Sequence, residues 1–128
     1  MLRLQIVSRG SLLFLCSFGL ALSFAEAQAR EIVLHSFAGG ADGAHPQAGL
    51  LADAKGNLYG TTPLGGAFRQ GTAFELDVAG NYTVLHSFSG PDGNTPVGGL
   101  VRDRASNLYG TAERNGGFGY GTVFEIIP

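Results

Sequence analysis

Apolar and polar positions alternate along most of the chain that follows Arg30. Over residues 71–77, Phe74 and Leu76 alternate with Glu75 and Asp77, the period-two pattern of a half-buried β-strand. Similar short runs predict three more strands, at 49–53, 57–62 and 82–88. No stretch after Arg30 combines helical periodicity with freedom from glycine and proline over the length that a helix needs. The pattern therefore predicts an all-β fold.

The strand pattern occurs twice, with a period of about 50 residues. The sequence GNLYGT at 56–61 returns as SNLYGT at 106–111. Four short antiparallel strands in such a period are typical of one β-propeller blade. We predict two propeller-type repeats, at about 34–84 and 85–127, which form an incomplete propeller. A sandwich or small barrel is the competing all-β fold, but neither requires successive sheets to repeat in sequence.

The segment at 1–29 has the composition of an export signal. Arg3 and Arg9 precede an uncharged apolar run at 12–24, and small residues end at Ala27-Gln28-Ala29. We predict a signal peptide at 1–29, cleaved after Ala29 or alternatively after Ala27; a retained signal anchor is the other reading. The run is shorter than the roughly 20 residues that span a bilayer as a helix. The expected location is secreted or periplasmic, with no transmembrane segment after cleavage.

Charge and cysteine content narrow the functional classes. Ten acidic and eight basic residues give a net charge of −2, without a basic cluster. Nucleic-acid binding relies on clustered lysine and arginine, so we expect no nucleic-acid partner. The single cysteine, Cys16, lies in the predicted signal peptide. The mature fold must therefore be stable without a disulfide.

Two histidines occupy the same position in both repeats. His35 and His86 are each followed by a serine, Ser36 and Ser87. Neighbouring residues of a strand point to opposite faces, so neither pair can act as nucleophile and base. We expect each imidazole to be bonded between strands. Metal binding together with His45 is the alternative, but we predict no metal, cofactor or catalytic residue.

The recurring carboxylates also favour structural roles. Each Asp-Gly pair, at 42–43 and 92–93, supplies one carboxylate, whereas a calcium loop needs several oxygen ligands. We expect these aspartates to cap backbone N–H groups in turns. Other acidic residues recur in pairs, Asp53 with Asp103 and Glu75 with Glu125. We expect them in turns and cross-strand contacts rather than in a glycosidase pair.

Residues that differ between the repeats are free to specialise. The tight turns at 54–56 and 78–81 should lie at one end of the sheet and the longer connections at 63–70 and 89–98 at the other, where binding residues often lie. The candidate binding residues on these loops are Phe68, Arg69, Arg114, Phe118 and Tyr120. Exposed aromatic and arginine side chains are common binding anchors; alternatively, the aromatic rings cover the edge of the blade.

Four residues of the long loops differ from their counterparts in charge or titratable character: His45, Arg69, Glu113 and Arg114. They are too few and too scattered along the sequence to indicate an active site. We therefore predict a binding or structural module, with a glycan or a surface component as the ligand. A propeller enzyme of the lyase or glycan hydrolase type is the alternative.

Several motifs together resemble a known bacterial repeat. They are LHSF at 34–37 and 85–88, Asp-Gly at 42–43 and 92–93, NLYGT at 57–61 and 107–111, and GTAFEL at 71–76 with GTVFE at 121–125. This set resembles the Gloeobacter/Verrucomicrobia repeat of exported proteins. The resemblance implies a propeller-like extracytoplasmic protein of unassigned activity, without catalytic residues to carry over. A fainter likeness to streptogramin lyase and NHL propellers fails where the Asp-Gly pairs lie well before the Asn-Leu-Tyr strand.

The order of the predicted strands along the sequence suggests how copies could assemble. Residues 31–37 match a fourth strand, whereas 99–127 supplies a first, second and third strand. Closed propellers take about four to eight blades, so two repeats cannot close a ring. We expect either that three or four copies close a ring by exchanging this strand, or that the sequence is a piece of a longer array.

Overall fold

The computed structural model describes residues 3–7, 11–15 and 21–128. The chain forms two compact units, Met1–Ile32 and Val33–Pro128. All regular elements in the described ranges are β-strands, which confirms the predicted all-β class. A search of those same ranges finds no helix that is long and apolar enough to cross a membrane.

The first unit contains one antiparallel sheet. Its strands are β1 (Arg3–Val7), β2 (Ser11–Leu15) and β3 (Ala21–Ala25), in the order β1-β2-β3. The predicted signal peptide falls on this unit, but residues 1–2, 8–10 and 16–20, with Arg9 and Cys16 among them, lie outside the described residues. Cleavage after Ala29 stays a prediction.

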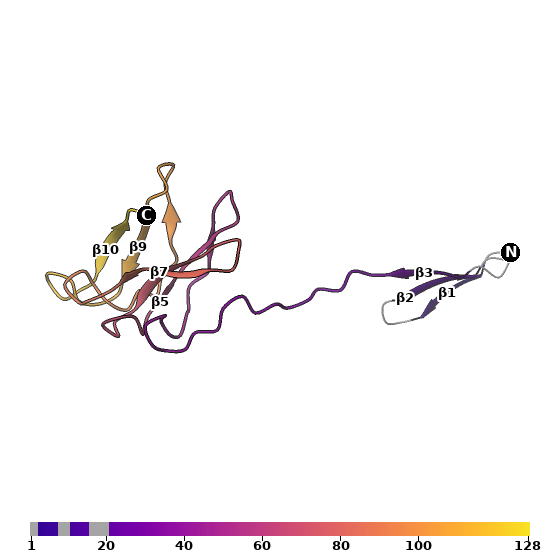
Figure 1. The fold of residues 1–128 in the computed structure, drawn as a ribbon, viewed down its shortest axis with the longest axis horizontal. Coiled ribbons are helices and arrows are strands. Elements are labelled where there is room, and N and C mark those ends of the chain that lie inside the picture. The colour runs from indigo at the N-terminus through magenta and orange to yellow at the C-terminus, as the bar shows by residue number, and fades with distance from the viewer. Residues whose placement is uncertain (1–2, 8–10, 16–20) are drawn as a thin grey trace. The chain divides into compact units, whose positions relative to one another are not determined.

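The second unit begins with a four-stranded meander. The strands β4 (Leu51–Ala52), β5 (Leu58–Thr62), β6 (Thr72–Leu76) and β7 (Tyr82–Ser87) pair in this order, all antiparallel (Figure 1). Each lies inside its predicted range, so the four strands of one repeat are confirmed. A register shift between Ala73 and Phe74 marks a bulge in the pairing of β6 with β7.

The second repeat forms a three-stranded sheet. Its strands are β8 (Val101–Arg102), β9 (Leu108–Ala112) and β10 (Thr122–Ile126), in the order β10-β9-β8 (Figure 1). The register of β9 with β10 repeats that of β5 with β6: Val123 pairs with Thr111 as Ala73 pairs with Thr61. The two repeats therefore share one strand order and one register.

The predicted strand at 31–37 does not form. This segment has no regular secondary structure. A fourth strand pairs with the third strand of the sheet before it, as β7 pairs with β6. In the second unit no such strand is paired with the segment, so its backbone gains no ladder hydrogen bonds. Its side chains still pack on the first sheet: the ring centroids of Phe37 and Phe74 are 5.4 Å apart.

An aspartate closes each tight turn of the sheets. Asp77 accepts hydrogen bonds from the backbone N–H of Ala79 at 2.9 Å and of Asn81 at 2.8 Å, and from the Asn81 side chain at 2.8 Å. The Asn81 side chain contributes most to lowering the pKa of Asp77. Asp53 and Asp103 accept the same bonds from the asparagine four residues later. The expected turn roles of Asp53 and Asp103 are confirmed.

The two sheets of the second unit stack through different faces. We call the side of the first sheet that carries Leu51, Tyr59, Thr61 and Ala73 its tyrosine face, and the opposite side, with Leu50, Leu58, Phe74 and Leu76, its leucine face. The equivalent residues of the second sheet are Val101, Tyr109, Thr111 and Val123 on the tyrosine face, and Leu100, Leu108, Phe124 and Ile126 on the leucine face. The core joins the tyrosine face of the first sheet to the leucine face of the second: Tyr59, Leu100 and Leu108 are buried together, and Leu51, Leu85, Phe124 and Ile126 pack against them.

Polar contacts fix this stacking. The hydroxyl of Thr61 donates to the carbonyl of Gly98 at 3.1 Å. Arg102 reaches from the second sheet to Asp53, with 3.6 Å between Nη1 and Oδ2, and its guanidinium lies 5.7 Å from the centre of the Tyr59 ring. A cation over an aromatic ring is attracted by the ring's quadrupole. The sheets are therefore joined by apolar burial and by a charged clamp at one edge.

Stacking leaves part of one face of each sheet open. Leu100, on the covered leucine face, is 6% exposed, whereas its counterpart Leu50 is 56% exposed. Ala73, on the covered tyrosine face, is fully buried, whereas its counterpart Val123 is 81% exposed. These two pairs differ in burial because only one member of each pair faces the other sheet. Phe74 and Leu76, also on the leucine face of the first sheet, are buried even so, and Phe37 packs on Phe74.

Candidate functional site

The long connections of the first repeat meet at one end of its sheet. The loop before β4 and the loop between β5 and β6 are joined by the N–H of Ala44, which donates to the carbonyl of Leu64 at 2.8 Å, and by the N–H of Gly66, which donates to the carbonyl of Gly40 at 2.9 Å. A Cβ on Gly65 would lie 2.6 Å from the Cα of Gly43. Glycine at this position allows the two backbones to come this close.

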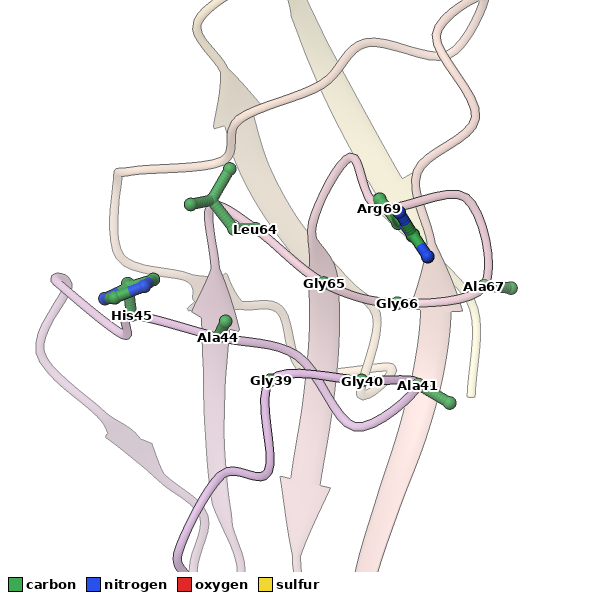
Figure 2. Close-up of a pocket in the computed structure, with 10 residues that line it drawn as sticks. All are labelled: Gly39, Gly40, Ala41, Ala44, His45, Leu64, Gly65, Gly66, Ala67 and Arg69. Atoms are coloured by element: carbon green, nitrogen blue, oxygen red, sulfur yellow. The ribbon is translucent and has the colours of Figure 1, made fainter.

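These loops line an open cavity of about 660 Å³. Its lining consists of Gly39, Gly40, Ala41, Ala44, His45, Leu64, Gly65, Gly66, Ala67 and Arg69. In Figure 2, His45 and Arg69 lie toward opposite ends of this lining, with the Gly39–Gly40 and Gly65–Gly66 backbones between them. The lining has a guanidinium, an imidazole and several peptide groups, but no carboxylate. It therefore suits a polar ligand that carries negative charge.

Both polar side chains come from left-handed backbone positions. The φ angle is 57° at His45 and 60° at Arg69, a region that costs a non-glycine residue roughly 1–2 kcal/mol. The counterpart of Arg69 in the second repeat is Gly119, with φ 83°, where the same turn is made without that cost. Strained residues often cluster at ligand sites. Arg69 stands where glycine would fit the backbone better, whereas the left-handed backbone at His45 recurs at its counterpart Thr95, with a φ angle of 55°.

The five predicted binding residues separate in the structure. Arg69 lines the cavity, and Phe68 beside it is exposed. Phe118 and Tyr120 are almost fully exposed on the loop of the second repeat. On the same loop, Nε of Arg114 lies 3.5 Å from Oε1 of Glu113. Arg114, Phe118 and Tyr120 do not line the cavity of the first repeat.

The sequence interpretation missed that His45 and Arg69 line one cavity. The expectation that the loop positions of differing charge are scattered is wrong for this pair. A signal was present, since both residues lie in long loops of the first repeat and both lack a charged or titratable counterpart in the second. The hydrogen bonds that join these loops link residues that lie far apart along the chain, which the sequence alone does not reveal.

The recurring histidines bind loop aspartates instead of bridging strands. Nε2 of His35 is 3.3 Å from Oδ2 of Asp42, and His86 contacts Asp92 in the same way. Asp42 also accepts the N–H of Ala38 at 2.9 Å; this bond, followed by the one from His35, lowers the pKa of Asp42 against the opposing effect of burial. The expected capping role of the Asp-Gly pairs is confirmed, and the expected cross-strand bond of the imidazole is wrong.

A tyrosine between two carboxylates recurs on both tyrosine faces. The hydroxyl of Tyr59 lies 3.2 Å from Oδ2 of Asp53 and 3.1 Å from Oε1 of Glu75. Tyr109 makes the same contacts with Asp103, at 3.0 Å, and Glu125, at 2.8 Å. Burial and then Glu75 raise the pKa of Tyr59. The cluster links the turn to the third strand in each repeat, which confirms the expected structural role of these carboxylates.

Comparison with known proteins gives one family. The model of the Gloeobacter/Verrucomicrobia repeat matches residues 17–128. No curated protein and no solved structure matches the chain. The match covers both sheets of the second unit, the cavity loops and the recurring Tyr–Asp–Glu clusters. The chain therefore belongs to the Gloeobacter/Verrucomicrobia repeat family.

Proposed function

We propose that this chain is an exported propeller-type repeat module that binds an acidic glycan, or another surface component bearing carboxylates, at the loop end of its first repeat. The observation that carries the proposal is the cavity lined by His45 and Arg69. The second repeat keeps the first three strands and the turn clusters but has Thr95 and Gly119 at these two positions. The first repeat thus differs from the second by a pair of side chains that can bind a ligand.

The propeller assignment is supported by how the sheets are arranged. Each repeat contributes an antiparallel meander, and successive sheets pack face to face through Tyr59, Leu100 and Leu108. Propeller blades bury each other's faces in this manner. Export is supported by the charged, apolar and small-residue segments that precede Arg30. We accordingly propose a secreted or periplasmic location.

The ligand class follows from the cavity lining. A guanidinium binds carboxylates through charge-assisted, often bidentate hydrogen bonds. The imidazole of His45 adds a hydrogen-bonding group at the other end of the cavity (Figure 2), and Phe68, which precedes Arg69 in the sequence, is exposed. The volume of about 660 Å³ falls in the range of about 300–1,000 Å³ that small-molecule sites occupy. A uronic-acid unit of a glycan meets these requirements.

The test is a glycan array that includes neutral and uronic-acid glycans, probed with the protein recovered from full-length expression. We expect binding to uronic-acid glycans that Arg69→Gly and His45→Thr remove, because each variant installs the residue of the second repeat. The matched control is Arg114→Leu, which removes an exposed arginine from the other loop and should leave binding unchanged. Equal loss in the control, or no binding to any glycan, would contradict the proposal. Turnover of a bound glycan would replace it with the enzyme alternative.

A further inference from the structure

The two open faces of the stacked sheets are copies of the two faces that pack together inside the chain. On the second sheet the tyrosine face is open, with Val101 and Val123 exposed. On the first sheet the leucine face is open in part: Leu50 is exposed beside an apolar hollow of about 380 Å³ lined by Phe37, Phe74, Leu76 and Tyr82 among others, whereas Phe74 and Leu76 are already buried. Inside the chain, a tyrosine face meets a leucine face.

We propose that the open tyrosine face of one copy of this chain binds the open leucine face of a second copy, head to tail, and thereby repeats the internal interface. The occupant is a second copy because each open face already has its complement within this same sequence. The contact joins two different surfaces, so it propagates from copy to copy and either closes a ring or forms an open array.

The residues of the proposed interface are the counterparts of those in the interface between the two sheets of one chain. Thr61 donates to the carbonyl of Gly98 inside the chain; the counterparts are Thr111, which is exposed, and Ala48 of the second copy. Val123 takes the place of the buried Ala73. Leu50 and Leu58, on the leucine face of the second copy, then become buried. Leu100 and Leu108 are buried in the same way in the interface inside the chain.

The same placement gives residues 31–37 the strand partner that they lack. Leu34, His35 and Phe37 of this segment match Leu85, His86 and Phe88 in and just after β7. Ala73 of β6 pairs with His86 of β7, so Val123 of β10 would pair with His35 of a second copy. Leu34, now exposed, would take the place of Leu85 in the core between the sheets. Association of two copies would thus pair the open edge of β10 and cover both apolar faces. Proteins usually cover exposed sheet edges and large apolar patches.

One contact of the internal interface is missing from the proposed one, and this makes the test specific. Inside the chain, Arg102 contacts Asp53 and the ring of Tyr59. In the proposed interface the counterpart of Arg102 is Ala52 of the second copy, which would face Asp103 and Tyr109 of the first copy. Ala52→Arg should restore the clamp and strengthen association severalfold. Val123→Asp should place a desolvated carboxylate in the interface, opposite an imidazole of the second copy, His35, that is already bonded to Asp42, and should weaken association about tenfold or more. Val78→Asp, an exposed valine in the turn between β6 and β7, is the matched control.

The experiment measures the mass of the protein from full-length expression by sedimentation velocity over a range of concentrations, for the wild type and the three variants. We expect reversible association that Ala52→Arg strengthens, Val123→Asp weakens and Val78→Asp leaves unchanged, with circular dichroism verifying that every variant is folded. Amide hydrogen exchange at 31–37 should slow as the protein associates. A folded monomer at all concentrations, or association with the same affinity in Val123→Asp as in Val78→Asp, would overturn the proposal. Polydisperse aggregation that Ala52→Arg does not change would also overturn it.

Discussion

Leucine-to-alanine changes at two equivalent positions would show whether the two sheets stack. Leu108 is fully buried in the core between the sheets, whereas its counterpart Leu58 is only half-buried on the open leucine face. Truncating a buried leucine costs about 2–5 kcal/mol, because transfer free energy is lost and a cavity remains. We expect Leu108→Ala to lower the free energy of unfolding by about 3–4 kcal/mol and Leu58→Ala by about 1–2 kcal/mol, since part of that side chain already contacts water.

The assay is urea unfolding followed by far-ultraviolet circular dichroism, at a protein concentration low enough to keep the chain monomeric. With a slope of about 1–3 kcal/mol per molar urea, a difference of about 2 kcal/mol should separate the two midpoints by about 0.7–2 M. Leu108→Met serves as a control that nearly conserves volume and should cost less than about 1.5 kcal/mol. Equal losses for the two alanine variants, or a larger loss at Leu58, would refute the stacking of the sheets.

Three further predictions concern turns, buried hydroxyls and pH. Ser106 has a φ angle of 79° where the first repeat has glycine, so Ser106→Gly should raise the free energy of unfolding by up to about 1 kcal/mol; a lower melting temperature would contradict this. Tyr59→Phe removes a buried donor shared by two carboxylates and should cost about 2 kcal/mol, measured by urea unfolding, whereas Tyr109→Phe, in the more exposed copy, should cost much less; equal costs would contradict the role of burial. The pKa of Asp77 is lowered, chiefly by Asn81, so this carboxylate stabilises the fold above its unfolded pKa of about 3.9 and that stability is lost as the pH falls through the folded pKa. The melting temperature should therefore drop below about pH 4, and by less in Asp77→Asn; an equal drop would contradict the prediction.

Strands with a local signature could be predicted from the sequence. Phe74 and Leu76 alternate with polar residues along β6, and the recurring NLYGT motif identifies β5 and β9. Turn residues set the ends of these strands, as Asp77 and Asn81 do between β6 and β7. Period-two alternation and turn chemistry act over a few residues, so one repeat is enough to display them.

Features that depend on distant partners could not be predicted in the same way. Residues 31–37 repeat most of the sequence of β7 but form no strand, because a strand needs a partner and the local sequence does not supply one. His45 and Arg69 line one cavity only because backbone hydrogen bonds join Ala44 to Leu64 and Gly66 to Gly40. The difference in burial between Ala73 and Val123 likewise depends on which sheet has a neighbour.

The most direct test of the proposed binding site is a nuclear magnetic resonance titration of the isotope-labelled protein with a uronic-acid oligosaccharide. We expect saturable shifts at the amides of Gly39, Gly40, Gly65 and Gly66, which line the cavity with His45 and Arg69. Their counterparts in the second repeat, Gly90 and Gly116, should not shift. Shifts confined to the second repeat, or no saturable shifts at the cavity, would contradict a binding site at the loop end of the first repeat.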